Sequence, residues 1–425
     1  MSNHVVQKQV MHLGIPYLKD MPDEKVRLCA ELVTNDATQT MYFEVDSPWK
    51  QYLVTELSDA FILGILEKAM KNSYDIFFEQ PMSEDLYYSL RTYLIPVYAR
   101  NFKMFHKISL YGKTTAQTLP TEGRVGTGFS AGVDSFYTVL KHLDDKICPH
   151  HNITHLMLAV NGAAATGVSE DMDRLWLESS KAKFLPYAKA LGLKLVCVGG
   201  NIDMLYVKDD CLHGDIITTA AFVYALQKLY GTYYWASAYQ AEIFNFTDGC
   251  FCENVAVPYV STRGIRFYHS GSETNRVGKV AFIADHPLVQ KGLTVCGEPE
   301  AINCGCCVKC LRTMAELNAV GKLEMFQEAF PVKVYQKHIK SKLAQELAVD
   351  HPPFTTEMKK NDVKIPFSIY PLAYLFYKPL EALRKKLRRS AWIRRLFYRF
   401  DFDLKLLGRK QTEEERKRKL NGVLK

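Results

Sequence analysis

The chain has 425 residues, enough for two or three domains with separate cores, and its 48% hydrophobic and 24% charged residues are typical of a globular protein. Its 11 cysteines are an odd number, and residues 1–20 contain no secretory hydrophobic run, so we expect a cytoplasmic protein without a disulfide framework. The longest nearly apolar stretch, residues 365–377, is well short of the ~20 residues of a membrane-spanning helix.

The N-terminal region, residues 1–120, is predicted to form a small accessory α/β domain. Residues 26–32 and 40–45 have the length and composition of paired strands, with Asn35-Asp36 between them. Helical spacing follows over residues 60–70 and 86–102, and a further strand is predicted over residues 108–112. No catalytic constellation is visible in this region.

Residues 121–325 alternate between strand and helix, which indicates an α/β domain with a parallel sheet covered on both faces. Strands are expected at residues 125–129, 155–160, 194–199 and 233–237. Helices are expected after Ser130 as far as Leu143, and over residues 174–191 and 218–229. The last part, residues 326–425, is predicted to be a helical and basic extension.

A short loop separates the first of these strands from its helix, and it favours nucleotide binding. Backbone N–H groups and the helix dipole converge on such a turn, where they can hold the phosphates of ATP. Serine hydroxyls add donors, a glycine allows close approach, and the aspartate either caps the helix or binds Mg²⁺. The alternative is a turn that only ends a strand and caps a helix. The residues are Ser130, Ala131, Gly132, Val133, Asp134 and Ser135.

A cysteine cluster near the end of the α/β domain is predicted to bind zinc. Cysteines spaced two residues apart in a tight turn can present thiolates to one ion, and four thiolates form a closed tetrahedral site, which is structural rather than catalytic. An iron–sulfur cluster and free thiols are the alternatives. The expected ligands are Cys296, Cys304, Cys307 and Cys310, and Cys306 is treated as spare.

The loop resembles the PP-loop motif Ser-Gly-Gly-x-Asp-Ser of the N-type ATP pyrophosphatases, with Ala131 in place of the first glycine. The loop followed by the cysteine cluster resembles the 7-cyano-7-deazaguanine synthase family over residues 124–314, including Lys279 on a helix ahead of Cys296. The resemblance implies that ATP adenylates 7-carboxy-7-deazaguanine, that ammonia displaces AMP to give an amide, and that a second ATP drives dehydration to the nitrile.

The additional terminal regions indicate a divergent relative of that family, some members of which occur in phage-defence loci. The resemblance therefore implies ATP, Mg²⁺ and a small carboxylic acid as ligands, with Ser130, Asp134, Ser135 and Lys279 as the catalytic candidates. Ammonia, a small amine or a partner protein remain alternatives for the acceptor of the acyl group. Oligomeric state stays open.

Several further polar residues are candidates for ligand binding, and each also has a purely structural explanation. Asn161 follows the second parallel strand and is a candidate for contact with adenine, or a turn residue. His213 could face the substrate, with Asp215 as a helix cap. Cations that could bind phosphate or carboxylate, or lie on the surface, are Arg276, Lys279 and Arg312. Remaining candidates near the sheet edge and the following helix start are Ser237, Tyr239 and Glu273.

The net charge of +8 is concentrated in the tail, since residues 378–425 contain 17 Lys and Arg against six Asp and Glu. Leucines on one face, and Trp and Phe on nearly the opposite one, predict two short helices that break near Ser390. Such helices contact an anionic membrane, nucleic acid or the body of the protein.

Two other functions compete with the carboxylate-activating enzyme. The first is a PP-loop thiolase acting on tRNA or another nucleic acid, which needs a reactive cysteine, and Cys197 and Cys211 are the candidates. The second is a non-catalytic nucleotide-sensing module, indicated by Ala131 and the additional domains.

Overall fold

The computed structural model describes residues 9–34, 37–160, 169–202, 215–242, 253–296, 303–335, 340, 344, 352–363 and 369–380. Contacts divide the chain into two compact units. The first unit consists of residues 1–130 and 138–273, and the second of residues 131–137 and 274–425. The predictions for Asn35-Asp36, Asn161, His213 and the tail helices beyond residue 380 lie outside the described residues.

The strands are β1 Val10–Leu13, β2 Tyr17–Met21, β3 Lys25–Val33, β4 Thr38–Asp46, β5 Asp75–Phe78, β6 Met82–Ser83, β7 Leu110–Tyr111, β8 Thr114–Thr115, β9 Arg124–Gly128, β10 His155–Ala159, β11 Lys194–Gly200, β12 Tyr230–Ala236 and β13 Arg266–Ser270. The helices are α1 Asp59–Asn72, α2 Glu84–Ser89, α3 Ile95–Asn101, α4 Val133–Lys141, α5 Glu170–Ala190, α6 Asp215–Ala225, α7 Glu253–Tyr259, α8 Arg276–Ile283, α9 Pro287–Gly292, α10 Val308–Ala319, α12 Pro352–Lys360 and α13 Ile369–Pro371.

The parallel part of the sheet in the first unit has the order β13-β12-β9-β10-β11. All four pairings in this part are parallel, as the alternating pattern predicts. Numbered along the chain and read from β11 to β13, the order is 3-2-1-4-5, and it reverses between β9 and β12. In such doubly wound sheets ligands bind at the carboxyl ends of the strands where the order reverses, and the loop 130–135 follows β9 at that point.

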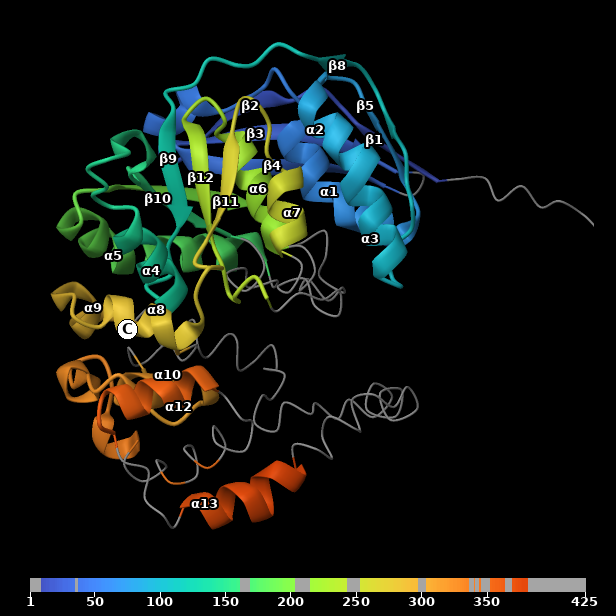
Figure 1. Cartoon of the computed structure of the whole chain (residues 1–425). Coiled ribbons are helices and arrows are strands. Elements are labelled where there is room, and N and C mark those ends of the chain that lie inside the picture. Colours follow the sequence, from blue (N-terminus) through green and yellow to red (C-terminus); the bar gives the residue numbers. More distant parts are fainter. Residues whose placement is uncertain are drawn as a thin grey trace, which may run out of the picture. The chain divides into compact units, whose positions relative to one another are not determined.

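Helices cover both faces of these strands, which confirms an α/β fold with a mostly parallel central sheet. In Figure 1, α5 lies on one side of the strands and α6 on the other. Helix α1 packs against α6 and is buried on nearly all sides. Gly64 of α1 faces β4, where a Cβ would meet Cε of Met41 at 2.3 Å.

The N-terminal strands continue the same sheet. Residues 26–32 and 40–45 pair in antiparallel fashion within β3 and β4, as predicted. Strand β4 also pairs with β11 through Gly199–Glu44 and Gly200–Phe43, so an 11-stranded sheet joins the two regions. The observed division therefore differs from the three predicted domains, since residues 1–120 share a sheet and a hydrophobic core with the parallel strands.

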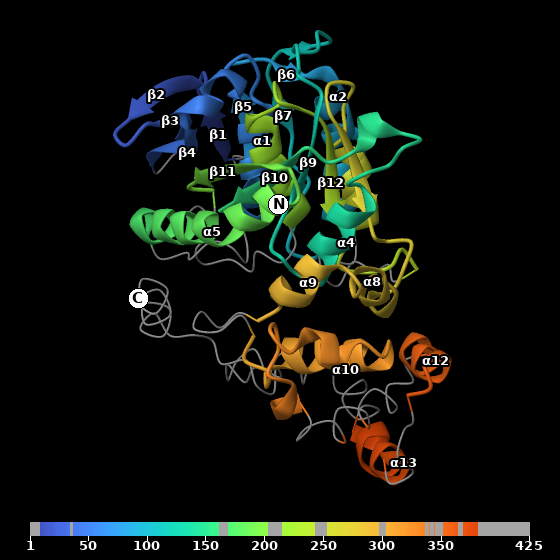
Figure 2. The same cartoon turned by 90° about the vertical axis from the view of Figure 1, so that its left-hand side faces the viewer.

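Predicted helices are confirmed at α1, α4, α5 and α6, with ends that differ from the prediction by up to four residues. Residues 86–102 form α2, a π-helical turn at Leu90–Leu94 and α3. Strand β13 was not predicted, because its segment Arg-Phe-Tyr-His-Ser lacks an apolar run. In the second unit α10 lies beside α12 in both views (Figures 1 and 2), and α8 also contacts α10.

Candidate functional site

The loop after β9 contains a strained residue at the position where the family motif has glycine. Ala131 has φ of +54°, in the left-handed region that favours glycine, and its side chain is fully buried. Its carbonyl oxygen accepts a hydrogen bond from the Thr294 amide at 2.8 Å. Residues in sparsely populated backbone regions are frequent at functional sites, so the strained turn makes this loop a candidate functional site.

Helix α4 begins directly after this turn. The Gly132 carbonyl accepts bonds from the Phe136 amide at 2.9 Å and from Ser135 Oγ at 3.1 Å. The Ser135 side chain is buried, and its hydroxyl donates to the carbonyl at the start of its own helix. Ser130 is exposed. Gly132 does not have a positive φ, so Ala131 rather than Gly132 adopts the left-handed conformation in this turn.

Asp134, in the first turn of α4, lies in a cluster of charged side chains. Its Oδ1 lies 2.9 Å from Nζ of Lys279, and its Oδ2 lies 3.2 Å from Arg276. Lys279 is 1% exposed, and both cations come from the first turn of α8. Asp134 is partly exposed, but Lys279 is buried, so their ion pair ties the start of α4 to α8 as long as both partners stay charged.

Two residues of α10 complete the cluster. Glu316 accepts bonds from Arg276 at 3.1 Å and from Arg312 at 3.0 Å, and Thr313 Oγ1 lies 3.3 Å from Arg276. Among the described residues, three cations therefore face two carboxylates. Sequence reasoning missed Thr313 and Glu316, although their spacing of three and six residues from Cys310 places all three on one helical face.

The cluster does not have the donor set of a Mg²⁺ site. Mg²⁺ requires oxygen ligands in near-octahedral geometry, and it repels neighbouring cations. Each oxygen of Asp134 already faces a cation, and Glu316 binds two arginines. In this structure the carboxylate of Asp134 anchors Lys279 and Arg276.

The four cysteines predicted to bind metal come together in the second unit. The sulfur atoms of Cys296, Cys304, Cys307 and Cys310 all lie within 4.8 Å of one another. Cys296 and Cys307 are 3.8 Å apart, and Cys304 and Cys310 are 3.9 Å apart. A tetrahedral zinc site with Zn–S bonds of about 2.3 Å has sulfur atoms about 3.8 Å apart, so the cluster fits a metal ion.

The local backbone explains why these thiols converge. Gly305 has φ of +74°, which turns the chain between Cys304 and Cys307. Cys307 then caps α10 and accepts a bond from the Cys310 amide. Burial raises the pKa of Cys304, but amide hydrogen bonds from Cys306 and Cys307 outweigh burial and lower it to about 6. Cys304 is thus prepared to bind metal as a thiolate.

Cys306 lies at the margin of this group. It is exposed, with its sulfur atom 3.7 Å from that of Cys304, and it is not one of the four mutually close cysteines. Its position agrees with its treatment as a spare thiol.

Helix α10 links the two clusters. Cys310 in its first turn belongs to the metal-binding group, while Thr313 and Glu316, one and two turns later, contact Arg276. A metal ion at the cysteines would therefore fix the start of the helix that positions the partner of Arg276.

Residues at the carboxyl edge of the first unit have partners of their own. Tyr239 donates its amide to Ser237 Oγ at 3.2 Å, so Ser237 shapes the turn after β12. Glu273 pairs with Lys141 and accepts the Gly271 amide at 3.0 Å. Tyr233 and Tyr234, in β12, are buried.

Cys197 is poorly suited to the thiolase chemistry considered above. It is buried on β11, and burial raises its pKa to about 12, so it stays a protonated thiol at neutral pH. The second candidate, Cys211, lies outside the described residues.

Among the residues that the structure describes, no helix is both long and apolar enough to cross a lipid bilayer. Comparison of the chain with models of known protein families, with curated proteins and with solved structures finds no match.

Proposed function

We propose that this protein is an ATP-dependent enzyme that activates a carboxylate by adenylation and couples it to a nitrogen nucleophile. The observation that carries the proposal is the placement of Lys279 and Arg276 on Asp134 in the first turn of α4. Two cations lie where the loop 130–135 and the helix N-terminus are predicted to bind phosphates.

The reaction has two steps. A carboxylate oxygen of the acid attacks the α-phosphorus of ATP, and the bond to the bridging oxygen breaks to release pyrophosphate. The nitrogen nucleophile then attacks the acyl carbon, and AMP leaves with the former carboxylate oxygen while the nitrogen loses a proton. Lys279 and Arg276 would stabilise charge on the departing pyrophosphate, because preorganised cations act strongly in a site of low dielectric.

Zinc is the metal proposed for the four cysteines. A set of four thiolates has no open coordination position, so the ion would be structural. Its part in function would be to hold α10, and through Glu316 to hold Arg276. The resemblance to 7-cyano-7-deazaguanine synthases makes a 7-deazaguanine carboxylic acid the first substrate to test.

An assay with labelled ATP tests the proposal. Metal-analysed protein is incubated with ATP, with and without 7-carboxy-7-deazaguanine, and AMP and pyrophosphate are measured. We expect acid-stimulated release of both products. Release should be at least 100-fold weaker in Lys279→Met, which loses a cation proposed to face the phosphates, and in Asp134→Asn, which loses the carboxylate that positions Lys279 and Arg276 (about 2.7 kcal/mol or more in each). Asp285→Asn is the matched control, since Asp285 is an exposed carboxylate of the same unit.

Two results would contradict the proposal. Nucleotide binding without AMP formation, tested across a panel of carboxylic acids, would exclude adenylation. Equal release from wild type and Asp134→Asn would show that the chemistry does not occur at this loop.

A further inference from the structure

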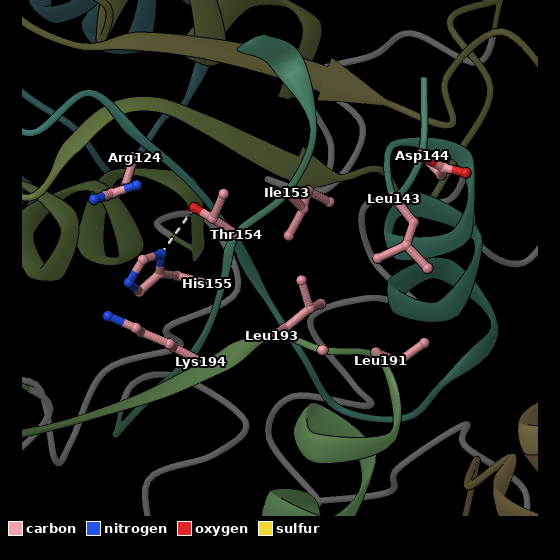
Figure 3. Close-up of a pocket in the computed structure, with 10 residues that line it drawn as sticks. Arg124, Leu143, Asp144, Ile153, Thr154, His155, Leu191, Leu193 and Lys194 are labelled. Carbon is pink, nitrogen blue, oxygen red and sulfur yellow. Dashed lines mark hydrogen bonds between the residues drawn. The ribbon is translucent and has the colours of Figure 1, made fainter. Parts of the chain in front are cut away.

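A pocket of about 550 Å³ opens in the first unit at the amino ends of three neighbouring parallel strands. Arg124 begins β9, His155 begins β10 and Lys194 begins β11 (Figure 3). The loop 130–135 leaves from the opposite end of β9, so this pocket is separate from the proposed catalytic site. Its volume lies within the range of small-molecule sites.

One side of the pocket is cationic. Figure 3 shows the His155 ring between the side chains of Arg124 and Lys194. Lys194 and His155 are direct partners in the β10–β11 register, and Lys194 is exposed without an ion pair in the described part of the chain. Arg124 pairs with Glu122 at 3.0 Å, and Glu122 also accepts a bond from the Tyr52 hydroxyl. The Glu122 carboxylate also interacts with Lys194 at longer range, but it is paired with Arg124, so Lys194 has no directly paired carboxylate among the described residues.

His155 supplies a buried polar group on the same side. It is 3% exposed, and its Nδ1 lies 2.8 Å from the hydroxyl of Thr154. Its Nε2 forms no hydrogen bond to any residue that the structure describes. Burial lowers the pKa of His155 to about 4, and the charges of Lys194 and Arg124 add to this effect, so the ring is neutral at pH 7. The Thr154 hydroxyl has one hydrogen, and the Val125 carbonyl lies 3.1 Å from the same oxygen. When that hydrogen is directed to Nδ1, Nε2 of His155 carries the proton and can donate to a ligand. When it is directed to Val125, Nδ1 donates to Thr154 and Nε2 is an acceptor.

The other side of the pocket is apolar. Its lining comes from the end of the α4 segment, the start of β10 and the turn before β11, namely Leu143, Ile153, Leu191 and Leu193. Asp144 is the acidic residue of the lining, and Figure 3 shows it on the side away from His155. Its carboxylate pairs with Lys146, so it does not cancel the charges of Arg124 and Lys194.

We propose that this pocket binds a small organic anion, with a carboxylate or phosphate ester head beside Arg124, His155 and Lys194 and an apolar body against the leucines. A simple inorganic anion would leave the apolar side in contact with water, and a neutral apolar molecule would leave Lys194 without a counter-charge. Both parts of the ligand are needed, because charge pairing alone contributes little at an exposed lysine.

Isothermal titration calorimetry of the full chain tests this site with four probes. Octanoate and octyl phosphate have both parts, 1-octanol has only the apolar body, and inorganic phosphate has only the charge. We expect one molecule of octanoate or octyl phosphate per chain, and the tighter of the two identifies the preferred head group. Octanol and inorganic phosphate are expected to bind at least tenfold more weakly.

Two variants locate the binding. Lys194→Glu reverses the charge at this position, and Leu193→Trp fills the apolar side, and each is expected to weaken the preferred probe at least tenfold. Lys103→Glu is the matched control at an exposed position outside the pocket, and it should bind like wild type. Absence of saturable binding by both amphiphilic probes would overturn the proposal. Binding that is unchanged in Lys194→Glu and Leu193→Trp would do so as well.

Discussion

Nζ of Lys279 lies 2.9 Å from Oδ1 of Asp134, although 145 positions separate the two residues in the chain. A buried lysine is costly unless its charge is paired, and desolvation would otherwise favour the neutral amine. The carboxylate of Asp134 therefore has a structural task in this arrangement as well as its proposed place beside ATP. The two roles can be separated by experiment.

Asp134→Asn is expected to lower the free energy of unfolding by about 3 kcal/mol, because it leaves Lys279 buried without its carboxylate. The double variant Asp134→Asn/Lys279→Met should recover part of that loss, since it removes both charges. Denaturant unfolding measures both values. ATP cleavage should stay absent in the double variant, which distinguishes a catalytic role from a stabilising one.

The control for these two variants is Asp285→Asn, at an exposed carboxylate that pairs with Lys322. Surface substitutions of this kind change stability by about 0.5 kcal/mol or less. A loss as large as that of Asp134→Asn would mean that removal of any carboxylate destabilises this unit.

Metal binding by the cysteine cluster is the second prediction. Cys304→Ser is expected to abolish one bound zinc per chain and to lower the unfolding temperature, because the binding energy of a structural zinc contributes to folding. Cys306→Ser should keep the metal. Elemental analysis and thermal unfolding, each with and without a chelator, compare the two variants. Metal loss in Cys306→Ser but not in Cys304→Ser would show that the ligand set is different.

Sequence patterns were sufficient for the parallel sheet and the cysteine group. Strongly apolar strands that alternate with helices are compatible with few folds other than a parallel sheet covered by helices. The Cys304-x2-Cys307-x2-Cys310 spacing indicates a turn followed by the start of a helix. The pairing of β4 with β11 could not be foreseen, because two short backbone contacts, at Gly199 and Gly200, leave no side-chain pattern.

The charged cluster was predictable only in part. Lys279 and Arg276 were candidates because of their place ahead of the cysteines, but a surface role was equally compatible with the sequence. Their shared partner, Asp134, depends on how α8 packs against α4, and that is a tertiary property. Glu316 gave only the weak signal of an i, i+4 pair with Arg312.

The left-handed backbone of Ala131 allows a third prediction. A non-glycine residue in this region costs about 1–2 kcal/mol, whereas glycine loses about 0.5–1 kcal/mol through its more flexible unfolded chain. Ala131→Gly should therefore be neutral or slightly stabilising in denaturant unfolding. Ala131→Val should be destabilising, because a β-branched side chain rarely adopts positive φ. Equal stability of the two variants would show that the backbone does not hold this conformation.

The fourth prediction concerns acid sensitivity and His142. Its ring stacks on Tyr234 with centroids 3.9 Å apart, and its Nε2 lies 3.0 Å from Ser270 Oγ. Burial lowers the pKa of His142 to about 4, with a further contribution from Lys141. Above pH 6.5 the ring is neutral in both folded and unfolded chains, so it adds no pH dependence.

Below pH 6.5 the unfolded chain binds a proton at His142 that the folded chain does not. Stability should therefore fall as pH decreases from 6.5 to about 4, by at most about 1.4 kcal/mol per pH unit from this residue. His142→Phe keeps the aromatic contact with Tyr234 and removes the titration. At pH 7.5 it should be less stable than wild type by about 1 kcal/mol, because Ser270 loses a hydrogen-bond partner.

The free energies of unfolding of His142→Phe and wild type should then converge as pH falls and cross between pH 6 and pH 5. Only the wild-type unfolded chain gains stability by binding a proton at this position. Urea unfolding at half-unit steps of pH measures both curves. Carboxylates that lose ion pairs in acid affect the two proteins alike and cancel in the difference. A constant difference across this range would mean that His142 is protonated in the folded chain as readily as in the unfolded one.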